Sequence, residues 1–222
     1  MNPLHWVAVS LREKGALQTA RIAGSVAMDL AFDWRYGTDT RRWVDEQELE
    51  ANSKNQAHSS PYRATKARPL LRLLRQLVLP RDSVFVDIGA GKGRVLLIAS
   101  HFGFKKVVGI EFSAKLCGIA RHNIEIFARR TTLRSPIEVV EIDATSYRFR
   151  PEESVLFMYN PFDSRVMAEI VRNIRESLKA HPRKIWLIYN TPQEHAVINA
   201  AGLFRTESLY EISGSRFRVY TN

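Results

Sequence analysis

The sequence predicts an α/β protein: a doubly wound, mostly parallel sheet of seven strands with a C-terminal antiparallel hairpin, preceded by an N-terminal helical extension. Three observations lead to this prediction. From Ser83 onward, short apolar runs alternate with helix-like runs, which is typical of a parallel sheet covered on both faces. A glycine-rich turn at 89–93 follows the first apolar run. Two β-rich runs near the C-terminus are separated only by Ser213-Gly214-Ser215, which favours a hairpin.

The first 60 residues differ in pattern from the rest, and we divide the chain into an extension at 1–60 and a main domain at 61–222. The extension has helix-like apolar patches near 4–11 and 16–32. A polar and aromatic stretch, Phe32–Thr40, follows them. Its position before the main domain suggests a lid or a substrate-binding element.

The main domain is expected to begin with a helix that Pro69 opens, because proline is favoured at the first helical position. Leucines at spacings of three and four after Pro69 give this helix one apolar face. The strands and helices that follow are predicted from the alternating pattern. Strands are expected at 83–88, 106–111, 137–142, 154–159 and 184–190, helices near 92–101, 113–130, 163–180 and 193–200, and the hairpin at 207–212 and 216–221.

The glycine-rich turn indicates a site where the backbone approaches a ligand closely, because glycine has no Cβ and tolerates positive φ. The run Val84–Ile88 leads through Asp87 into Gly89-x-Gly91-x-Gly93. A dinucleotide fold would have its third glycine at the position of Arg94, and a P-loop would have serine or threonine after Lys92. The spacing therefore excludes both of these nucleotide sites, and the acid suits a ligand with a positive charge or with hydroxyl groups.

Polar residues close the strands that follow. In a doubly wound sheet, ligands bind at the carboxyl ends of the strands, where the strand order reverses. Glu111 closes the second strand, about 20 residues past the turn, and can accept hydrogen bonds from two ribose hydroxyls. Asp143 closes the third strand and can accept from an exocyclic amine. Asn160-Pro161-Phe162 closes the fourth, and Tyr189-Asn190 closes the fifth and can line the same cleft.

Taken together, the motif D-x-G-x-G-x-G and these strand ends resemble class I S-adenosylmethionine-dependent methyltransferases over residues 83–222. The resemblance implies a seven-stranded Rossmann-like fold, methyltransferase activity and S-adenosylmethionine as cofactor. It implies that Glu111 holds the ribose hydroxyls and that Asp143 and the Ala144 backbone contact adenine. The full set of cofactor-binding residues expected on this basis is Asp87, Gly89, Ala90, Gly91, Gly93, Glu111, Phe112, Asp143 and Ala144, with Tyr62 and Thr65 covering the methionine end.

Asn160-Pro161-Phe162 resembles the [DNS]-P-P-[YFW] motif of amino-directed methyltransferases, although it is one residue shorter and lacks the second proline. The resemblance implies a catalytic turn. The Asn160 carbonyl would accept protons of an acceptor amine, and Phe162 would stack on the acceptor or lie against the sulfonium through cation–π attraction. A structural turn without catalytic function is the other interpretation of the same residues.

The composition of the chain excludes several classes of protein. With 45% hydrophobic residues the chain can bury a core, and no run reaches the roughly 18 apolar residues of a membrane-spanning helix. We find no secretory signal and expect a cytoplasmic protein. Cys117 is the only cysteine, so no intrachain disulfide can form. The six histidines are scattered, and no metal site is predicted.

The net charge of +10 is concentrated between Glu50 and Asp82. This segment contains no acid and is expected to bind an acidic or phosphate-bearing partner or to be a solvated helix face. The residues expected to take part in binding are Lys54, Arg63, Lys66, Arg68, Arg72 and Arg75. Three functions remain open. They are a nitrogen-directed methyltransferase acting on a protein side chain or RNA, a methyltransferase acting on a small molecule, and a non-catalytic nucleic-acid-binding protein of the same fold.

Overall fold

The computed structural model describes residues 3–42, 44, 63–160 and 162–222. Its centre is one seven-stranded sheet in the order β3-β2-β1-β4-β5-β7-β6. The strands are β1 (Val84–Ile88), β2 (Lys106–Glu111), β3 (Ile137–Glu141), β4 (Glu153–Tyr159), β5 (Trp186–Asn190), β6 (Thr206–Ile212) and β7 (Ser215–Thr221). Strands β1 to β5 pair in parallel, and β7 is antiparallel to both β5 and β6. The predicted fold class and hairpin are therefore confirmed.

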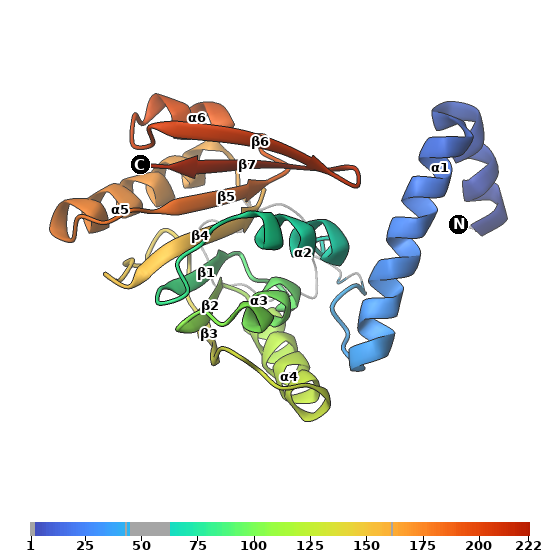
Figure 1. Cartoon of the computed structure of the whole chain (residues 1–222), viewed down its shortest axis with the longest axis horizontal. Helices are drawn as coiled ribbons and strands as arrows, with labels where there is room; N and C mark the ends of the chain where they lie inside the picture. Colours follow the sequence, from blue (N-terminus) through green and yellow to red (C-terminus); the bar gives the residue numbers. More distant parts are fainter. Residues whose placement is uncertain (1–2, 43, 45–62, 161) are drawn as a thin grey trace.

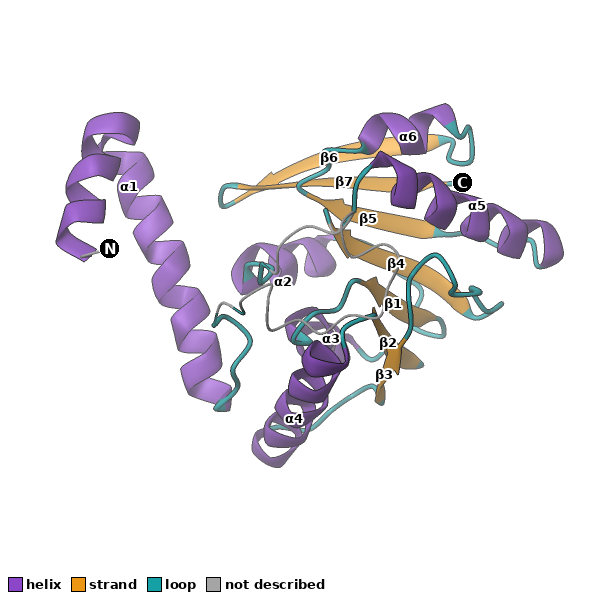
Figure 2. Ribbon diagram, turned by 180° about the vertical axis from the view of Figure 1, so that it is seen from behind, coloured by secondary structure: helices purple, strands orange, loops and turns teal. Residues whose placement is uncertain are grey.

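Helices cover both faces of this sheet (Figures 1 and 2). The helices are α1 (Pro3–Tyr36), α2 (Ala67–Gln76), α3 (Arg94–Ala99), α4 (Ala114–Arg130), α5 (Ser164–Ala180) and α6 (His195–Ala200), with a 3-10 turn η3 (Ser100–Phe102) after α3. Residues of α2, α3 and the C-terminal end of α4 pack on the face that presents Phe85. Residues of α5 and α6 pack on the opposite face, against Val86 and Ile88.

Helix α2 shows how the sequence pattern builds this core. Leu70, Leu73 and Leu74 are completely buried at the spacing of three and four that the sequence indicated. Each such side chain contributes about 1.5–3 kcal/mol when removed from water. The helix begins two residues earlier than predicted, at Ala67, so that Pro69 lies in its first turn, where no intrahelical N–H bond is lost.

The N-terminal extension is helical, with a kink between the two predicted apolar patches. Within α1 the backbone is non-helical at Gly15 (φ 77°), which lies between the patches near 4–11 and 16–32. The C-terminal part of α1 contacts the main domain, since Phe32 is buried and its ring stacks on Phe127 of α4 at 6.4 Å. Figure 1 shows the N-terminal part of α1 standing away from the sheet. No described helix is long and apolar enough to cross a membrane.

Candidate active site

The glycine turn lies where the strand order reverses, between β1 and its neighbours β2 and β4. Gly89, Gly91 and Gly93 have φ values of 82°, 53° and 84°, which other residues adopt only with strain. A Cβ at Gly93 would also lie 3.2 Å from the Cβ of Ala120 in α4. The N–H groups of Gly89 and Ala90 both donate to the carbonyl of Ile110 at 2.9 Å, which ties the turn to β2.

Glu111 fixes the turn from the end of β2. One carboxylate oxygen accepts from the N–H of Gly91 at 2.9 Å, and the other accepts from the N–H groups of Phe112 and Ser113 at 3.0 Å. Burial raises the pKa of Glu111, and these backbone hydrogen bonds oppose that shift. A carboxylate has about four lone-pair positions, so Glu111 keeps acceptor capacity after these three bonds.

Asp87 is the buried acid of the site. It is 2% exposed and has no hydrogen-bond or ion-pair partner within the described part of the chain. Burial, followed by the negative charge of Glu111, raises its pKa well above the usual value. An isolated carboxylate in this environment is destabilised in its charged form. A cationic ligand at the end of β1 would relieve that penalty.

The third predicted acid sits at a turn after β3. Asp143 is half-buried, and its Oδ1 accepts from the Thr145 N–H at 2.8 Å and from the Thr145 hydroxyl at 2.7 Å. Ala144 is buried and Phe112 is half-buried. The backbone of Ile142 donates to the Glu111 carbonyl at 2.9 Å, so the ends of β2 and β3 are held together.

Asn160 follows β4, and its amide group has a defined orientation. Its Oδ1 accepts from the Tyr189 hydroxyl at 2.8 Å, and its Nδ2 donates to Gln193 Oε1 at 2.8 Å. The Tyr189 hydroxyl accepts from the Glu194 N–H at 3.2 Å, so its own proton is directed to Asn160. Burial raises the pKa of Tyr189 to about 12, which keeps that proton in place.

The backbone of Asn160 is also unusual, with φ at 37°. Asparagine tolerates this region better than most residues, and such conformations gather at functional sites. Phe162 is 7% exposed and packs in the core on the α5 face. Pro161 and Tyr62 lie outside the described residues, and Thr65 is buried.

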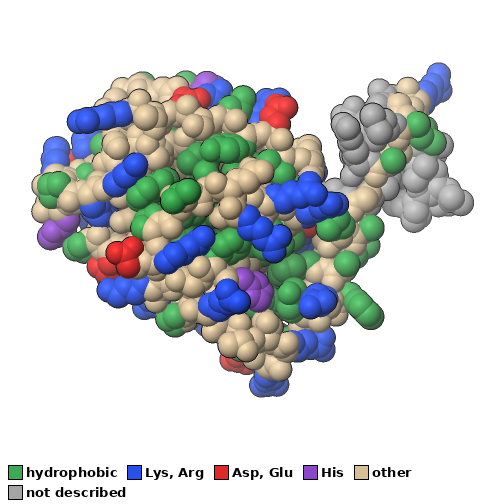
Figure 3. All heavy atoms as spheres, in the orientation of Figure 1, with side chains coloured by type: hydrophobic (Ala, Val, Ile, Leu, Met, Phe, Trp, Pro, Cys, Tyr) green, Lys and Arg blue, Asp and Glu red, His purple; other side chains and the backbone are tan. Residues whose placement is uncertain are grey.

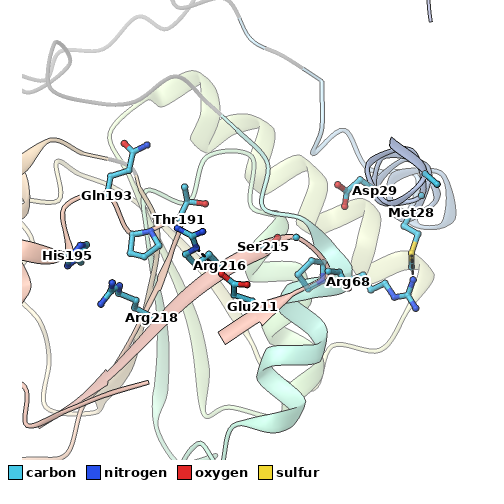
Figure 4. Close-up of a pocket in the computed structure, with 16 residues that line it drawn as sticks. Met28, Asp29, Arg68, Thr191, Gln193, His195, Glu211, Ser215, Arg216 and Arg218 are labelled. Atoms are coloured by element: carbon cyan, nitrogen blue, oxygen red, sulfur yellow. Dashed lines mark hydrogen bonds and ion pairs between the residues drawn. The ribbon is translucent and has the colours of Figure 1, made fainter. Parts of the chain in front are cut away.

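A cavity of about 1220 Å³ opens between α1, the start of α2, the loop after β5 and the β6–β7 hairpin. Figure 4 shows it between α1 and the β6–β7 hairpin, with Thr191, Gln193 and His195 on one side and Asp29 and Arg68 on the other. Asn160 does not line this cavity, but its side chain bonds Gln193, which does. Among the described residues, no group of histidine, cysteine, aspartate or glutamate could hold a metal ion.

A family profile described as "Histone methylation protein DOT1" matches residues 44–185, which is well over half of the chain. The chain belongs to this family. It is an S-adenosylmethionine-dependent methyltransferase, as the sequence predicted, and its cofactor is S-adenosylmethionine. No curated protein sequence matches it.

Solved structures share the fold of the methyltransferase. An RNA methyltransferase from Salinibacter ruber, in complex with S-adenosylhomocysteine, is 19% identical (TM-score 0.52), with 71% of this chain and 92% of that chain covered. A SAM-dependent methyltransferase from Aquifex aeolicus is 14% identical (TM-score 0.54), with 80% and 98% covered. A candidate O-methyltransferase from Nostoc punctiforme is 15% identical (TM-score 0.55), with 70% covered; the chain spans only 55% of its length.

Two cations at the glycine turn, Lys92 within it and Arg94 at the start of α3, have a role that the sequence did not reveal. Arg94 is 2% exposed, and its guanidinium pairs with Asp29 at 3.2 Å and Asp33 at 3.1 Å. It also donates to the Thr40 hydroxyl at 2.7 Å and to the Thr65 carbonyl at 3.3 Å. The turn of the methyltransferase is thus joined to the end of α1 and to the segment before α2.

Lys92 makes a second connection of the same kind. It is 1% exposed and pairs with Asp39 at 3.0 Å. Asn123 of α4 accepts from the Asp39 N–H at 2.8 Å and donates to the Lys92 carbonyl at 3.0 Å. The end of the predicted Phe32–Thr40 lid is therefore bonded to the glycine turn. One signal existed in the sequence, since Asp29 and Asp33 are four residues apart and share one face of a helix.

Proposed function

We propose that this enzyme methylates a nitrogen atom of a macromolecule, a protein side chain or RNA, presented to the Asn160 turn. The observation that carries the proposal is the fixed orientation of the Asn160 amide at the end of β4, whose nitrogen bonds Gln193 in the wall of an open cavity. An amide oxygen held in this way can accept a hydrogen bond from the N–H of an amine and so orient the lone pair of the amine nitrogen. Much of the acceleration would come from such positioning.

We further propose that the residues around the glycine turn bind the cofactor. The buried, unpaired Asp87 suits the positive charges of S-adenosylmethionine, and the spare acceptor capacity of Glu111 suits two ribose hydroxyls. Gly89, Gly91 and Gly93 would let the backbone approach closely. Asp143, Ala144 and Phe112 would surround the adenine. The fit of a cation to Asp87 rests on its burial without a counter-charge.

The cofactor supplies an electrophilic methyl group on a sulfonium. The chain would hold the acceptor nitrogen in line with that methyl. Tyr189 and Gln193 would act as positioning residues that keep Asn160 in one rotamer. Phe162 would anchor the turn in the core, because its ring is buried there. A lysine acceptor would arrive protonated, with a pKa of about 10.4, and must lose a proton before it attacks.

The domain division follows from the same proposal. Residues 61–222 would form the cofactor-binding domain, and 1–60 an extension that is bonded near the glycine turn through its residues 29–40. The hydrogen bond from the Arg94 guanidinium to the Thr65 carbonyl supports the proposal that Thr65 covers the methionine end of the cofactor. A cytoplasmic location and the role of Tyr62 stay predictions.

Two substitutions separate cofactor binding from methyl transfer. Glu111→Ala should weaken S-adenosylmethionine binding, measured by calorimetry, because it removes the ribose contact and releases the Gly91 N–H. Asn160→Ala should leave that affinity nearly unchanged and lower kcat. Wild-type turnover by Asn160→Ala would refute the catalytic role of the turn.

The acceptor class can be found with labelled S-adenosylmethionine. Protein, RNA and small-molecule fractions of a cell extract are each incubated with the enzyme and with Asn160→Ala. Label that enters protein or RNA only with the wild-type enzyme would support the proposal. Label confined to the small-molecule fraction would instead identify a small-molecule methyltransferase.

A further inference from the structure

A second cavity of about 1020 Å³ lies on the other side of Arg68, and we call it the arginine groove. Its walls are the C-terminal part of α1, helix α2, the α3–η3 end and the loop before β3. Figure 3 shows Lys and Arg side chains, with a histidine among them, where α1 meets α2 and α3. None of its lining residues, all of which are described, is acidic. Six of them are arginines: Arg35, Arg68, Arg72, Arg75, Arg81 and Arg134.

These positive charges are not neutralised within the described part of the chain. None of the six arginines forms an ion pair there. Arg72 donates to the Ser213 hydroxyl at 3.1 Å, and Arg68 contacts the sulfur of Met28. Elsewhere on the molecule arginines do have acidic partners, as Arg216 does in Glu211. Six uncompensated charges around one hollow repel one another, and an anionic partner would relieve that repulsion.

The charges form a row, which suits a polymeric anion better than a single small one. Arg68, Arg72 and Arg75 are four and three residues apart on one face of α2 and span about 10 Å along its axis. Arg35 and Arg81 add two positive charges to the same groove from neighbouring elements. The guanidinium fork matches a phosphate with two parallel hydrogen bonds, which favours a nucleic acid.

Flat side chains are interleaved with these arginines. Tyr36, His101 and Phe102 are half-buried in the groove wall. Arg35 lies 5.6 Å from the Tyr36 ring centre, and Arg81 lies 5.3 Å from that of Phe102. Burial and the charge of Arg134 lower the pKa of His101, so its ring is neutral near pH 7. Bases stack on such rings and on arginine planes when they are unpaired, as in a single strand.

The arginine groove adjoins the cavity that Gln193 lines, because the two hollows share two lining residues. Met28 and Arg68 line both hollows, and Gln193 at the far end bonds Asn160. A strand lying along α2 would pass Arg68 into the first cavity, whose opposite wall contains Gln193, the partner of Asn160 (Figure 4).

We propose that the arginine groove binds single-stranded RNA and that the acceptor is a nucleotide of that strand. This inference rests on the proposed function for the transfer step, but not for the binding itself. It uses Arg68, Arg72 and Arg75 of the basic segment that the sequence singled out. Of the others, Arg63 is exposed, Lys66 is half-buried, and Lys54 lies outside the described residues.

The test compares two double variants with the same change of net charge. Arg72→Ala with Arg75→Ala removes two exposed groove arginines from α2. Arg165→Ala with Arg172→Ala removes two exposed arginines from α5, on the opposite face of the sheet. Binding of a fluorescent single-stranded RNA oligonucleotide is measured by anisotropy at several salt concentrations, and thermal unfolding checks that both variants fold.

The groove variant should bind RNA at least tenfold more weakly than the wild-type enzyme, and the α5 variant within twofold. The slope of log affinity against log salt should fall by about 1.4 in the groove variant alone, since each lost phosphate contact contributes about 0.7. Equal losses in both variants, or none in the groove variant, would overturn the proposal. The proposal would also be overturned if polyglutamate displaced the RNA and bound more tightly than it, because the groove would then be a protein-binding surface.

S-adenosylmethionine calorimetry on the same proteins keeps the two proposals apart. Both variants should bind the cofactor like the wild-type enzyme. RNA binding that depends on the groove, without methyl transfer to the RNA, would contradict the acceptor assignment and leave the Asn160 mechanism open to another acceptor. Equally fast methyl transfer to RNA by both variants would contradict only the proposal that the arginine groove binds the RNA.

Discussion

Replacing Arg94 with alanine should be among the most damaging single changes in this enzyme. The side chain is 1% exposed and holds two carboxylates, a hydroxyl and a carbonyl. Removing one partner of a buried ion pair costs about 3–5 kcal/mol, because the remaining charges stay buried. Asp29 and Asp33 are 13% and 16% exposed, so water can reach them partly, which favours the lower half of that range. A typical domain has only about 5–15 kcal/mol of stability in total.

The assay is urea and thermal unfolding at pH 7.5, with Arg216→Ala as the matched control. Arg216 pairs with Glu211, but both side chains are about two-thirds exposed (66% and 67%), so its loss should cost about 0–1 kcal/mol. For a chain of this size, 3 kcal/mol corresponds to a fall in Tm of about 6–12 °C. Arg94→Lys keeps the charge without the fork and should lie between the two. A change below 1 kcal/mol in Arg94→Ala would refute the reasoning.

The pH dependence of this variant provides a second check on the cause. Burial raises the pKa of Asp29, while the Ala67 N–H and then Arg94 hold it down. Without Arg94 the folded-state pKa rises further, so the folded protein binds more protons than the unfolded chain and stability is lost as pH rises. The loss should therefore be larger at pH 7.5 than at pH 4.5. A loss that does not vary with pH would point to a packing defect rather than an unpaired carboxylate.

Three further changes test other parts of the structure. Gly109→Ala should lower the free energy of unfolding in urea by about 1–3 kcal/mol, because its Cβ would lie 2.6 Å from Leu96 Cδ1. Gly118→Ala has nothing within 4 Å of its Cβ and should raise that free energy by about 0.5–1 kcal/mol. Equal effects of the two changes would contradict the packing around Gly109. Asp87→Asn should raise stability at neutral pH, since ionising the buried acid destabilises the fold as pH rises above about 4. The same change should lower the affinity for S-adenosylmethionine about 10–150-fold in calorimetry. A variant that binds the cofactor like the wild-type enzyme would show that Asp87 is not a cofactor-binding residue. Tyr189→Phe should lower kcat with little change in KM for the cofactor, because it frees the Asn160 amide to rotate; an unchanged kcat would exclude this positioning role.

The sequence was sufficient for the sheet and for the strand ends, and the physical reason is local. Glycines with positive φ at Gly89, Gly91 and Gly93 and the acids that end two strands are set by neighbours along the chain. The predicted strands accordingly fall within about two residues of the observed ones. The orientation of Asn160 was not predictable, since it depends on Tyr189 and Gln193, about 30 residues away in sequence.

The burial of Lys92 and Arg94 was hidden for the same reason. Read along the chain, both are ordinary exposed cations at a helix start. Their partners Asp29, Asp33 and Asp39 lie more than 50 residues upstream. Only the folded arrangement shows that these two cations bind the extension. Phe162 is a similar case, because its ring turns into the core on the α5 face and not into the cleft.

The ion pair between Arg94 and Asp29 connects the proposed cofactor site with the arginine groove. Asp29 pairs with Arg94, the residue after the glycine turn, and its carboxylate also accepts from the Ala67 N–H at 3.0 Å, the first residue of α2. Its neighbour Met28 contacts Arg68 and lines both the arginine groove and the cavity that has Gln193 in its wall. The spacing between α1 and α2, and hence the width of the groove, therefore depends on an ion pair with the proposed cofactor turn. Arg94→Lys should accordingly weaken RNA binding more than Arg72→Ala does, although Arg94 itself is too deeply buried to touch the strand.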